Sequence, residues 1–263
     1  MNANQDKVTL AKLAQKKQRG QKISALTAYD FPTALLVDQS GVDIILVGDS
    51  LGMEELGYDT TLPVTMDIML HHLKAVRRGT KRALLVADMP FLSYQVNADE
   101  AVRNAGRLLQ EGGAEAVKLE GGVSIAPTIK RLVDAGVPVM GHIGFTPQSV
   151  HQIGLRVQGK DEDSAQRLRD GALAVQQAGA FAVVLELIPG EIAAQITQEL
   201  AIATIGIGAG PGCDGQVLVT SDLLGLRPDR PQLKHVRQYA QIGEEIAHAL
   251  RAYRDDVENG KFP

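Results

Sequence analysis

Ionisable side chains stand at the ends of five consecutive apolar runs of the sequence. They are Asp49, Asp88, Lys118 with Glu120, His142 and Glu186. The carboxylates of Asp49, Asp88 and Glu120 offer hard oxygen ligands without a histidine pair or thiolates, which favours magnesium, with manganese a chemical possibility, over zinc. A single carboxylate in such a place is equally typical of a cap for the following helix. Several buried charges are costly together unless a cation or hydrogen bonds compensate them, so their convergence indicates a functional site.

Side-chain alternation along the apolar runs predicts which of these groups share a face. Successive side chains of a strand point to opposite faces of the sheet. The rule places the following residues together: Val86 with Asp88, Lys118 with Glu120, Val184 with Glu186, and, if the strand stays regular, Ile45 and Val47 with Asp49. The ionisable groups should therefore gather where the strands end.

Short β-branched runs alternate with longer amphipathic segments, as buried parallel strands alternate with helices. Eight strands are predicted, at residues 23–28, 43–47, 83–87, 116–119, 137–141, 181–185, 203–207 and 216–219. Helix ends are indicated by glycines before the next strand, at Gly41, Gly113, Gly136 and Gly179, and helix starts by the capping residues Thr65 and Asn97.

Eight parallel strands close into a barrel, whereas a doubly wound sheet would leave two edges exposed. We therefore predict an α/β fold, a (β/α)₈ TIM-like barrel, as one domain over residues 1–263. Residues 7–19 indicate an extra N-terminal helix, and the segment after the last strand indicates further helix. Either is suited to covering a barrel end or contacting another subunit.

Composition narrows the classes of partner and compartment. The formal net charge is −4 and no basic stripe is present, so nucleic-acid binding is not expected. Cys213 is the only cysteine, which excludes an intrachain disulfide or a multi-thiolate metal site and fits a reduced cytoplasm. The first twenty residues lack an apolar centre and no 18-residue apolar run occurs, so we expect neither an export signal nor a membrane span.

Three features resemble functional motifs but have plainer explanations. The alternating glycines of residues 206–212 lack the GxGxxG spacing and a following Gly-Lys-Ser/Thr, which favours a tight loop over a phosphate site. Cys213 has no evident base in the sequence, which favours an inert thiol. The adjacent His71 and His72 diverge around a helix, so they do not form a two-histidine metal face.

Taken in order, the strand-end motifs resemble those of the ketopantoate hydroxymethyltransferase family over most of the chain. They are TAYD at 27–30, VGDSLGM at 47–53, TLPVT at 61–65, ADMPF at 87–91, VKLEGG at 117–122, GHIGFTPQ at 141–148 and GIGAG at 206–210. Any one of these motifs is weak evidence by itself, but the ordered set is highly specific. Two positions depart from the family pattern: Phe145 stands where Leu is common, and His235 where an aromatic residue is expected. The second bears on the C-terminal cover or oligomer contacts rather than on the chemistry.

The resemblance implies residue roles, substrates and assembly. Asp49, Asp88 and Glu120 would serve a Mg²⁺ site, the last through water. Asp49, Ser50, Asp88 and Lys118 would contact the keto acid, Glu186 would accept a proton, and His142 would line the pocket. The family also implies a cytoplasmic homo-oligomer, often a homodecamer, that takes 3-methyl-2-oxobutanoate to ketopantoate for pantothenate and coenzyme A synthesis. The donor would be 5,10-methylenetetrahydrofolate, for which the sequence itself has no visible recognition motif.

The implied chemistry suits these side chains. A metal-chelated keto acid would lose its C3 proton to Glu186 while Lys118 places positive charge near the substrate oxygens, and the enolate would attack the one-carbon group. Two alternatives stay open: a Mg-dependent carbon–carbon lyase or mutase of the phosphoenolpyruvate mutase/isocitrate lyase type, and a noncatalytic keto-acid-binding barrel. Ketopantoate formation that depends on the folate donor would separate them.

Overall fold

The computed structural model describes residues 7–229 and 233–263. Its contacts divide the chain into two compact units, residues 1–217 and 218–263, and each is described by itself. The prediction of a single domain stays a prediction.

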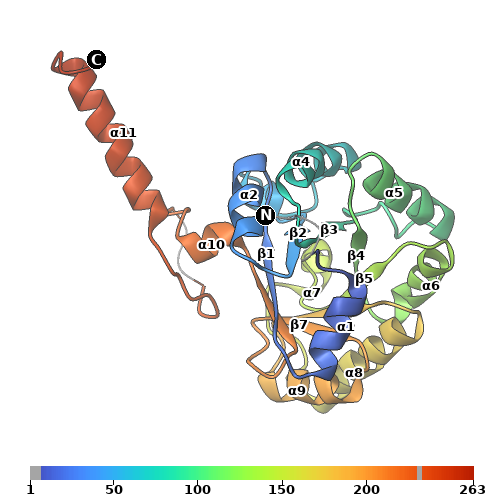
Figure 1. The fold of residues 1–263 in the computed structure, drawn as a ribbon. Helices are drawn as coiled ribbons and strands as arrows, with labels where there is room; N and C mark the ends of the chain where they lie inside the picture. Colours follow the sequence, from blue (N-terminus) through green and yellow to red (C-terminus); the bar gives the residue numbers. More distant parts are fainter. Residues whose placement is uncertain (1–6, 230–232) are drawn as a thin grey trace. The chain divides into compact units, whose positions relative to one another are not determined.

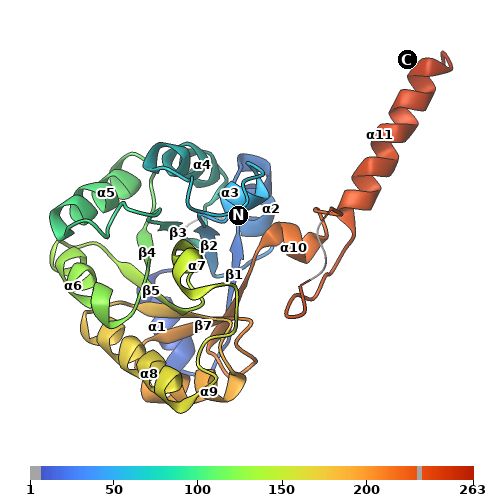
Figure 2. The same cartoon turned by 180° about the vertical axis from the view of Figure 1, so that it is seen from behind.

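The first unit is built on eight parallel strands that pair in chain order and close into a barrel (Figures 1 and 2). The strands are β1 (Ile23–Thr27), β2 (Ile44–Val47), β3 (Leu84–Asp88), β4 (Ala116–Glu120), β5 (Val139–Gly144), β6 (Ala182–Glu186), β7 (Ala203–Ile207) and β8 (Gly215–Leu218). All eight predicted strands are present. The (β/α)₈ barrel fold is confirmed.

Helices surround this barrel in the order that the amphipathic segments predict. They are α2 (Phe31–Gln39), α3 (Leu51–Glu54), α4 (Met66–Gly79), α5 (Ala98–Gln110), η1 (Val123–Ile125), α6 (Ala126–Asp134), η2 (Pro147–Ser149), α7 (Val150–Ile153), α8 (Glu162–Gln177) and α9 (Gly190–Glu199). The predicted caps are real: Thr65 accepts from the Ile68 amide, and Asn97 accepts from the Glu100 amide. The four predicted helix-ending glycines all have positive φ, between 75° and 95°.

Apolar side chains form two concentric layers because strand residues alternate between the barrel interior and the helices. The inner layer includes Ile44, Leu46, Val86, Met140 and Val184. The outer layer holds the alternate strand residues against the helices. With the interior filled by apolar side chains, polar groups can meet only toward the ends of the barrel.

The N-terminal end of the barrel is closed by the predicted extra helix, α1 (Leu10–Gln18), which lies across it in Figure 1. Leu13 is 2% exposed and packs with the inner layer. Lys16 pairs with Asp43 at 2.6 Å and Lys17 with Asp214 at 2.7 Å, so charged contacts surround this apolar plug. Helix α1 does not cover the opposite, C-terminal end of the barrel, where the residues that end the strands lie.

The second unit carries the predicted C-terminal helical segment as α10 (Thr220–Leu224) and α11 (Ile242–Glu258). Ile246, Leu250, Tyr253 and Val257 are exposed along α11, and His235 is exposed in the loop before it. Within residues 7–229 and 233–263, no helix combines the length and apolar character needed to span a bilayer.

Candidate active site

The chain turns sharply where β2 ends, and this turn places Asp49. Ile45 and Val47 pack in the outer layer, yet Asp49 lies among the charged groups at the barrel mouth, where its amide donates to Asp88 Oδ2 at 3.0 Å. The prediction that Asp49 shares a face with Ile45 and Val47 required a regular strand, and this condition is not met, because the strand stops at Val47 and alternation ends with it. A Cβ at Gly48 would lie 2.8 Å from Ser50 Oγ, so a larger residue there would displace the Ser50 side chain.

Asp88 and Lys118 form the base of the site from neighbouring strands in register. Lys118 Nζ lies 3.2 Å from Asp88 Oδ1, and both side chains are almost fully buried. Burial raises the pKa of Asp88, although Lys118 opposes the rise. Burial would lower the pKa of Lys118, but the nearby carboxylates, with Asp88 foremost, hold it above its ordinary value. Lys118 is thus a charged ammonium in a dry setting.

His142 lies at the centre of the site, not merely at its margin. Its Nδ1 is 3.1 Å from Lys118 Nζ, and its Nε2 is 3.1 Å from Glu186 Oε2. Burial and Lys118 disfavour a proton on the ring, but Glu120 and Glu186 outweigh them and raise its pKa to about 9. The two carboxylates thus favour the protonated ring, although its Nδ1–H would then face the Lys118 ammonium 3.1 Å away.

The carboxylates of Glu120 and Asp49 complete the cluster. Glu120 Oε1 lies 3.5 Å from His142 Nδ1, and Glu120 Oε2 accepts from the Gln148 amide at 2.9 Å. Burial raises the pKa of Asp49 well above its ordinary value, and the charges of Asp88 and Glu120 add to the rise. The cluster therefore holds more negative charge than Lys118 can balance.

Two carboxylate oxygens supply the observation that bears on a metal. Asp88 Oδ1 and Glu120 Oε1 are buried and accept no hydrogen bond, although Lys118 Nζ lies 3.2 Å from the first and His142 Nδ1 3.5 Å from the second. Buried carboxylate oxygens that accept no hydrogen bond are costly, and a divalent cation would stabilise them. In the described parts of the chain, no three His, Cys, Asp or Glu side chains are grouped to hold one ion together. Magnesium commonly takes one or two carboxylates and completes its shell with water or substrate oxygens, so these residues fit it.

Ser50 and Tyr29 border the cluster on the β1–β2 side. Tyr29 Oη and Ser50 Oγ are 2.8 Å apart, and Tyr29 is buried. The structure thus brings the predicted site residues to one end of the barrel, namely Asp49, Ser50, Asp88, Lys118, Glu120, His142 and Glu186. Their individual roles stay predictions.

Gln148 and Tyr94 are residues that the sequence reasoning did not single out. Gln148 is 6% exposed, and its side chain donates to Asp49 Oδ2 at 2.9 Å. Tyr94 is 1% exposed and contacts both Gln148 and Glu120. Gln148 belongs to the GHIGFTPQ motif, but as a neutral residue beyond a strand end it carried no chemical signal of its own.

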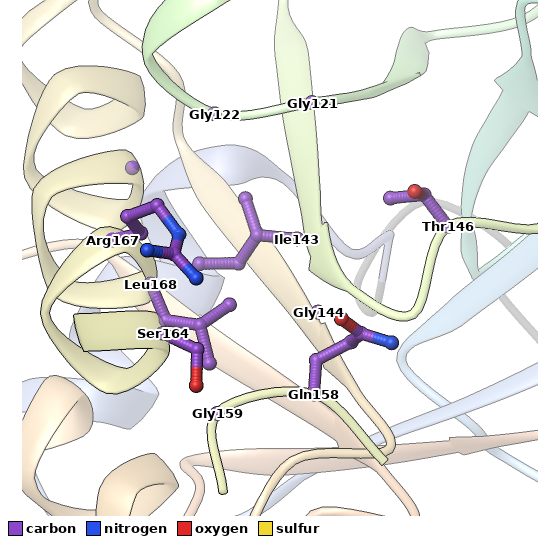
Figure 3. A pocket seen from close by; sticks show the side chains of 11 residues that line it. Gly121, Gly122, Ile143, Gly144, Thr146, Gln158, Gly159, Ser164, Arg167 and Leu168 are labelled. Atoms are coloured by element: carbon purple, nitrogen blue, oxygen red, sulfur yellow. The ribbon is translucent and has the colours of Figure 1, made fainter. Parts of the chain in front are cut away.

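A cavity of about 210 Å³ lies beside this cluster, between the ends of β4 and β5 and helix α8. Figure 3 shows Arg167 and Leu168 of α8 next to Ile143 of β5, with Thr146 and Gln158 on the other side. Its lining includes Gly144, which is in register with Glu186. The cavity adjoins the site but contains none of its carboxylates.

The glycine-rich segment at 206–212, Cys213 and His72 have structural roles rather than roles in a second site. A Cβ at Gly206 would lie 2.9 Å from Cys213 Sγ, and one at Gly212 would lie 2.8 Å from Ala194 Cβ, so close packing accounts for these glycines. Burial raises the pKa of the Cys213 thiol, which disfavours the reactive thiolate. His72 Nδ1 donates to the Tyr29 carbonyl oxygen at 2.7 Å.

The sequence is similar to a family of known enzymes along nearly its whole length. The family model for ketopantoate hydroxymethyltransferase matches residues 7–263. The 3-methyl-2-oxobutanoate hydroxymethyltransferase of Chloroflexus aurantiacus is 58% identical over 98% of this chain and 91% of its own length. The enzyme of the same name from Moorella thermoacetica is 56% identical over 99% of this chain and 97% of its own length.

Solved structures with the same fold are much more distant in sequence. Phosphonopyruvate hydrolase in complex with oxalate and Mg²⁺ has a TM-score of 0.63 and 14% identity, covering 96% of this chain and 88% of that one. 2,3-Dimethylmalate lyase, a member of the PEP mutase/isocitrate lyase superfamily, has a TM-score of 0.59 and 18% identity, covering 95% and 88%. At such identities the likeness establishes the barrel fold alone.

Proposed function

Because the chain belongs to the ketopantoate hydroxymethyltransferase family, we propose that it transfers a hydroxymethyl group to 3-methyl-2-oxobutanoate and forms ketopantoate. We further propose 5,10-methylenetetrahydrofolate as the one-carbon donor, Mg²⁺ as the cofactor, and a place in pantothenate and coenzyme A synthesis. The observation that carries the proposal is that one buried cluster places a charged ammonium and a partly exposed carboxylate on opposite sides of the same imidazole ring. Lys118 lies on one side of His142 and Glu186 on the other.

Lys118 is suited to binding the substrate's negative charge. Its ammonium is held in place by Asp88 and is almost fully buried, so its attraction to an anionic oxygen is little screened by water. Ser50 and Asp49 border the same space. These groups would orient the α-keto acid and favour the form in which negative charge moves onto the keto oxygen.

Glu186 is suited to removing the C3 proton. Its side chain is 18% exposed, in contrast to the nearly buried Lys118 and Asp88. His142 Nε2 lies 3.1 Å from Glu186 Oε2 and would fix the carboxylate on the substrate side. Proton abstraction would produce an enolate whose C3 attacks the methylene carbon of the donor, and water would then cleave the remaining carbon–nitrogen bond, releasing tetrahydrofolate and the hydroxymethyl product.

Asp49 and Asp88 would hold the magnesium ion, with Glu120 in contact through water. Bound there, the ion would supply Lewis-acid stabilisation of the charge that develops on the keto oxygen. Asp88 Oδ1 and Glu120 Oε1, both buried without a hydrogen-bond partner, support this assignment. A cytoplasmic homo-oligomer, with a homodecamer as the specific form, completes the proposal.

One assay tests the activity directly. The purified protein is incubated with 3-methyl-2-oxobutanoate, with and without 5,10-methylenetetrahydrofolate and with Mg²⁺ or EDTA, and ketopantoate is measured by mass spectrometry. We expect product only when donor and metal are both present, and Mg²⁺ added after EDTA should restore it. Full activity in EDTA contradicts the metal assignment. Cleavage of the keto acid without donor indicates a lyase, and binding without turnover indicates a noncatalytic barrel.

A further inference from the structure

Gln148 connects three strand ends that lie far apart in the sequence. It sits in η2, after β5, and is 6% exposed. Its backbone amide donates to Glu120 Oε2 at 2.9 Å. Its side-chain Nε2 donates to Asp49 Oδ2 and to the Met89 carbonyl oxygen, each at 2.9 Å. One residue thus holds two of the site's carboxylates and the chain segment directly after a third.

The surrounding hydrogen bonds fix the orientation of the Gln148 amide. Tyr94 Oη donates to Gln148 Oε1 at 2.8 Å, and Gln95 Nε2 donates to the same oxygen at 3.0 Å. Tyr94 Oη in turn accepts from the Glu120 amide at 3.0 Å, and its single proton is better placed for Gln148 than for the Glu120 carbonyl oxygen at 3.2 Å. A reversed amide would set its NH₂ group against two donors, so Nε2 must face Asp49.

Gln148 donates to one oxygen of each of two carboxylates and leaves the other oxygen of each without a bond from it. Gln148 donates to Oε2 of Glu120, while Oε1 is buried, accepts no hydrogen bond and lies 3.5 Å from His142 Nδ1. For Asp49, the Gln148 side chain donates to Oδ2 and makes no bond to Oδ1. A neutral amide can direct a carboxylate in this way without bringing a positive charge that would compete with a metal ion, as an Arg or Lys in its place would.

We propose that Gln148 is a positioning residue, kept in orientation by Tyr94, that aims the Asp49 and Glu120 carboxylates at one divalent cation. The inference rests on the metal site of the proposed function and extends it to a residue that does not itself ligate. Groups that orient metal ligands typically affect metal affinity by roughly 10–100-fold when they are replaced.

The test measures metal binding without turnover. Mn²⁺ serves as the probe, because the electron paramagnetic resonance signal of free Mn²⁺ reports how much of it the protein has bound. For Gln148→Met, which keeps the side-chain length but removes the amide, the dissociation constant for Mn²⁺ should rise roughly 10–100-fold. Tyr94→Phe keeps Gln148 but loosens its amide, and should raise that constant roughly twofold to tenfold, the equivalent of one neutral hydrogen bond.

Gln166→Met is the matched control, because this exposed α8 glutamine bonds Asp170 and Arg169 and none of the site residues. It should bind Mn²⁺ like the unaltered protein. Circular dichroism and gel filtration of the metal-free proteins establish that each variant is folded. If Gln148→Met does not fold, Tyr94→Phe decides alone, and wild-type Mn²⁺ affinity in that variant overturns the proposal.

The outcomes also separate this inference from the proposed function. Wild-type Mn²⁺ affinity and wild-type ketopantoate formation in folded Gln148→Met overturn the positioning role and leave the activity standing. Weakened Mn²⁺ binding in Gln148→Met, together with a wild-type protein that makes no ketopantoate, supports the positioning role and overturns the activity. A wild-type protein that binds no Mn²⁺ overturns the positioning role.

Discussion

Replacing Glu186 with Gln should separate substrate binding from proton abstraction. Glu186 ends β6, and its Oε2 lies 3.1 Å from His142 Nε2. Glutamine has nearly the same shape, and its amide oxygen can still accept a hydrogen bond from His142 Nε2. The amide cannot take up a proton at neutral pH. The substitution therefore removes the proposed base and leaves the substrate-binding side of the site, at Lys118 and Asp88, unchanged.

The size of the effect follows from the role. A positioned general base contributes about 10²–10⁴-fold to a rate, which corresponds to about 2.7–5.4 kcal/mol of barrier. The affinity for 3-methyl-2-oxobutanoate should change by less than about threefold, because the base acts in the transition state and contributes little to binding of the ground-state substrate. A large loss of rate with a small change in affinity distinguishes a base from a residue that only binds.

The assay is exchange of the C3 proton, followed by proton NMR in D₂O with Mg²⁺ and the keto acid but no folate donor. Affinity is measured by calorimetry under the same conditions. Glu191→Gln, an exposed position near the start of α9, is the control and should exchange at the wild-type rate. Exchange at an undiminished rate in Glu186→Gln, with binding intact, would refute the assignment of Glu186 as the base.

Three further predictions test the electrostatics, the β2 turn and the barrel plug. The pKa of Asp49 is raised in the folded state, so its favourable contribution exists below its unfolded pKa near 4 and is lost as the pH rises through the folded value. Asp49→Asn should therefore raise the stability of the metal-free protein at pH 8 in urea unfolding while weakening Mg²⁺ binding in calorimetry; equal or lower stability contradicts this. Gly48→Ala places a Cβ 2.8 Å from Ser50 Oγ and should lower kcat/KM for the keto acid by about 10²-fold with little change in the thermal midpoint. Leu13→Ala should lower the free energy of unfolding by about 2–5 kcal/mol and leave the KM for the keto acid unchanged, as urea unfolding and steady-state kinetics would measure.

The fold could be predicted because strands of a closed barrel are apolar on both faces and are therefore visible as continuous runs. The one strand whose far end was clearly missed is β5, predicted to end at Gly141 but continuing to Gly144. His142 and two glycines look like the end of a strand in sequence. In a barrel mouth, however, a polar inward residue is tolerated, and the backbone of residues 142–144 pairs with β6.

The charged residues of the site could be predicted because each follows a visible strand, but the way they are held could not. Asp49 reaches the cluster through a turn at which side-chain alternation no longer applies. Gln148 reaches Asp49 across 99 positions of the sequence, and no local pattern distinguishes its amide from that of a surface glutamine. Hydrogen bonds of this kind depend on tertiary structure, which sequence periodicity does not encode.

The electrostatic balance of the cluster explains why its carboxylates are held by amides. Four carboxylates, Asp49, Asp88, Glu120 and Glu186, share the mouth with only two groups that can carry positive charge, the Lys118 ammonium and the His142 imidazole. Amide N–H groups stabilise a carboxylate but cancel none of its charge. The metal-free cluster therefore carries an excess of acidic groups, and burial together with the charges of Asp88 and Glu120 raises the pKa of Asp49. A divalent cation would remove this repulsion without displacing a resident positive group. The same excess that makes the empty cluster unfavourable thus favours binding of the ion on which the proposed chemistry depends.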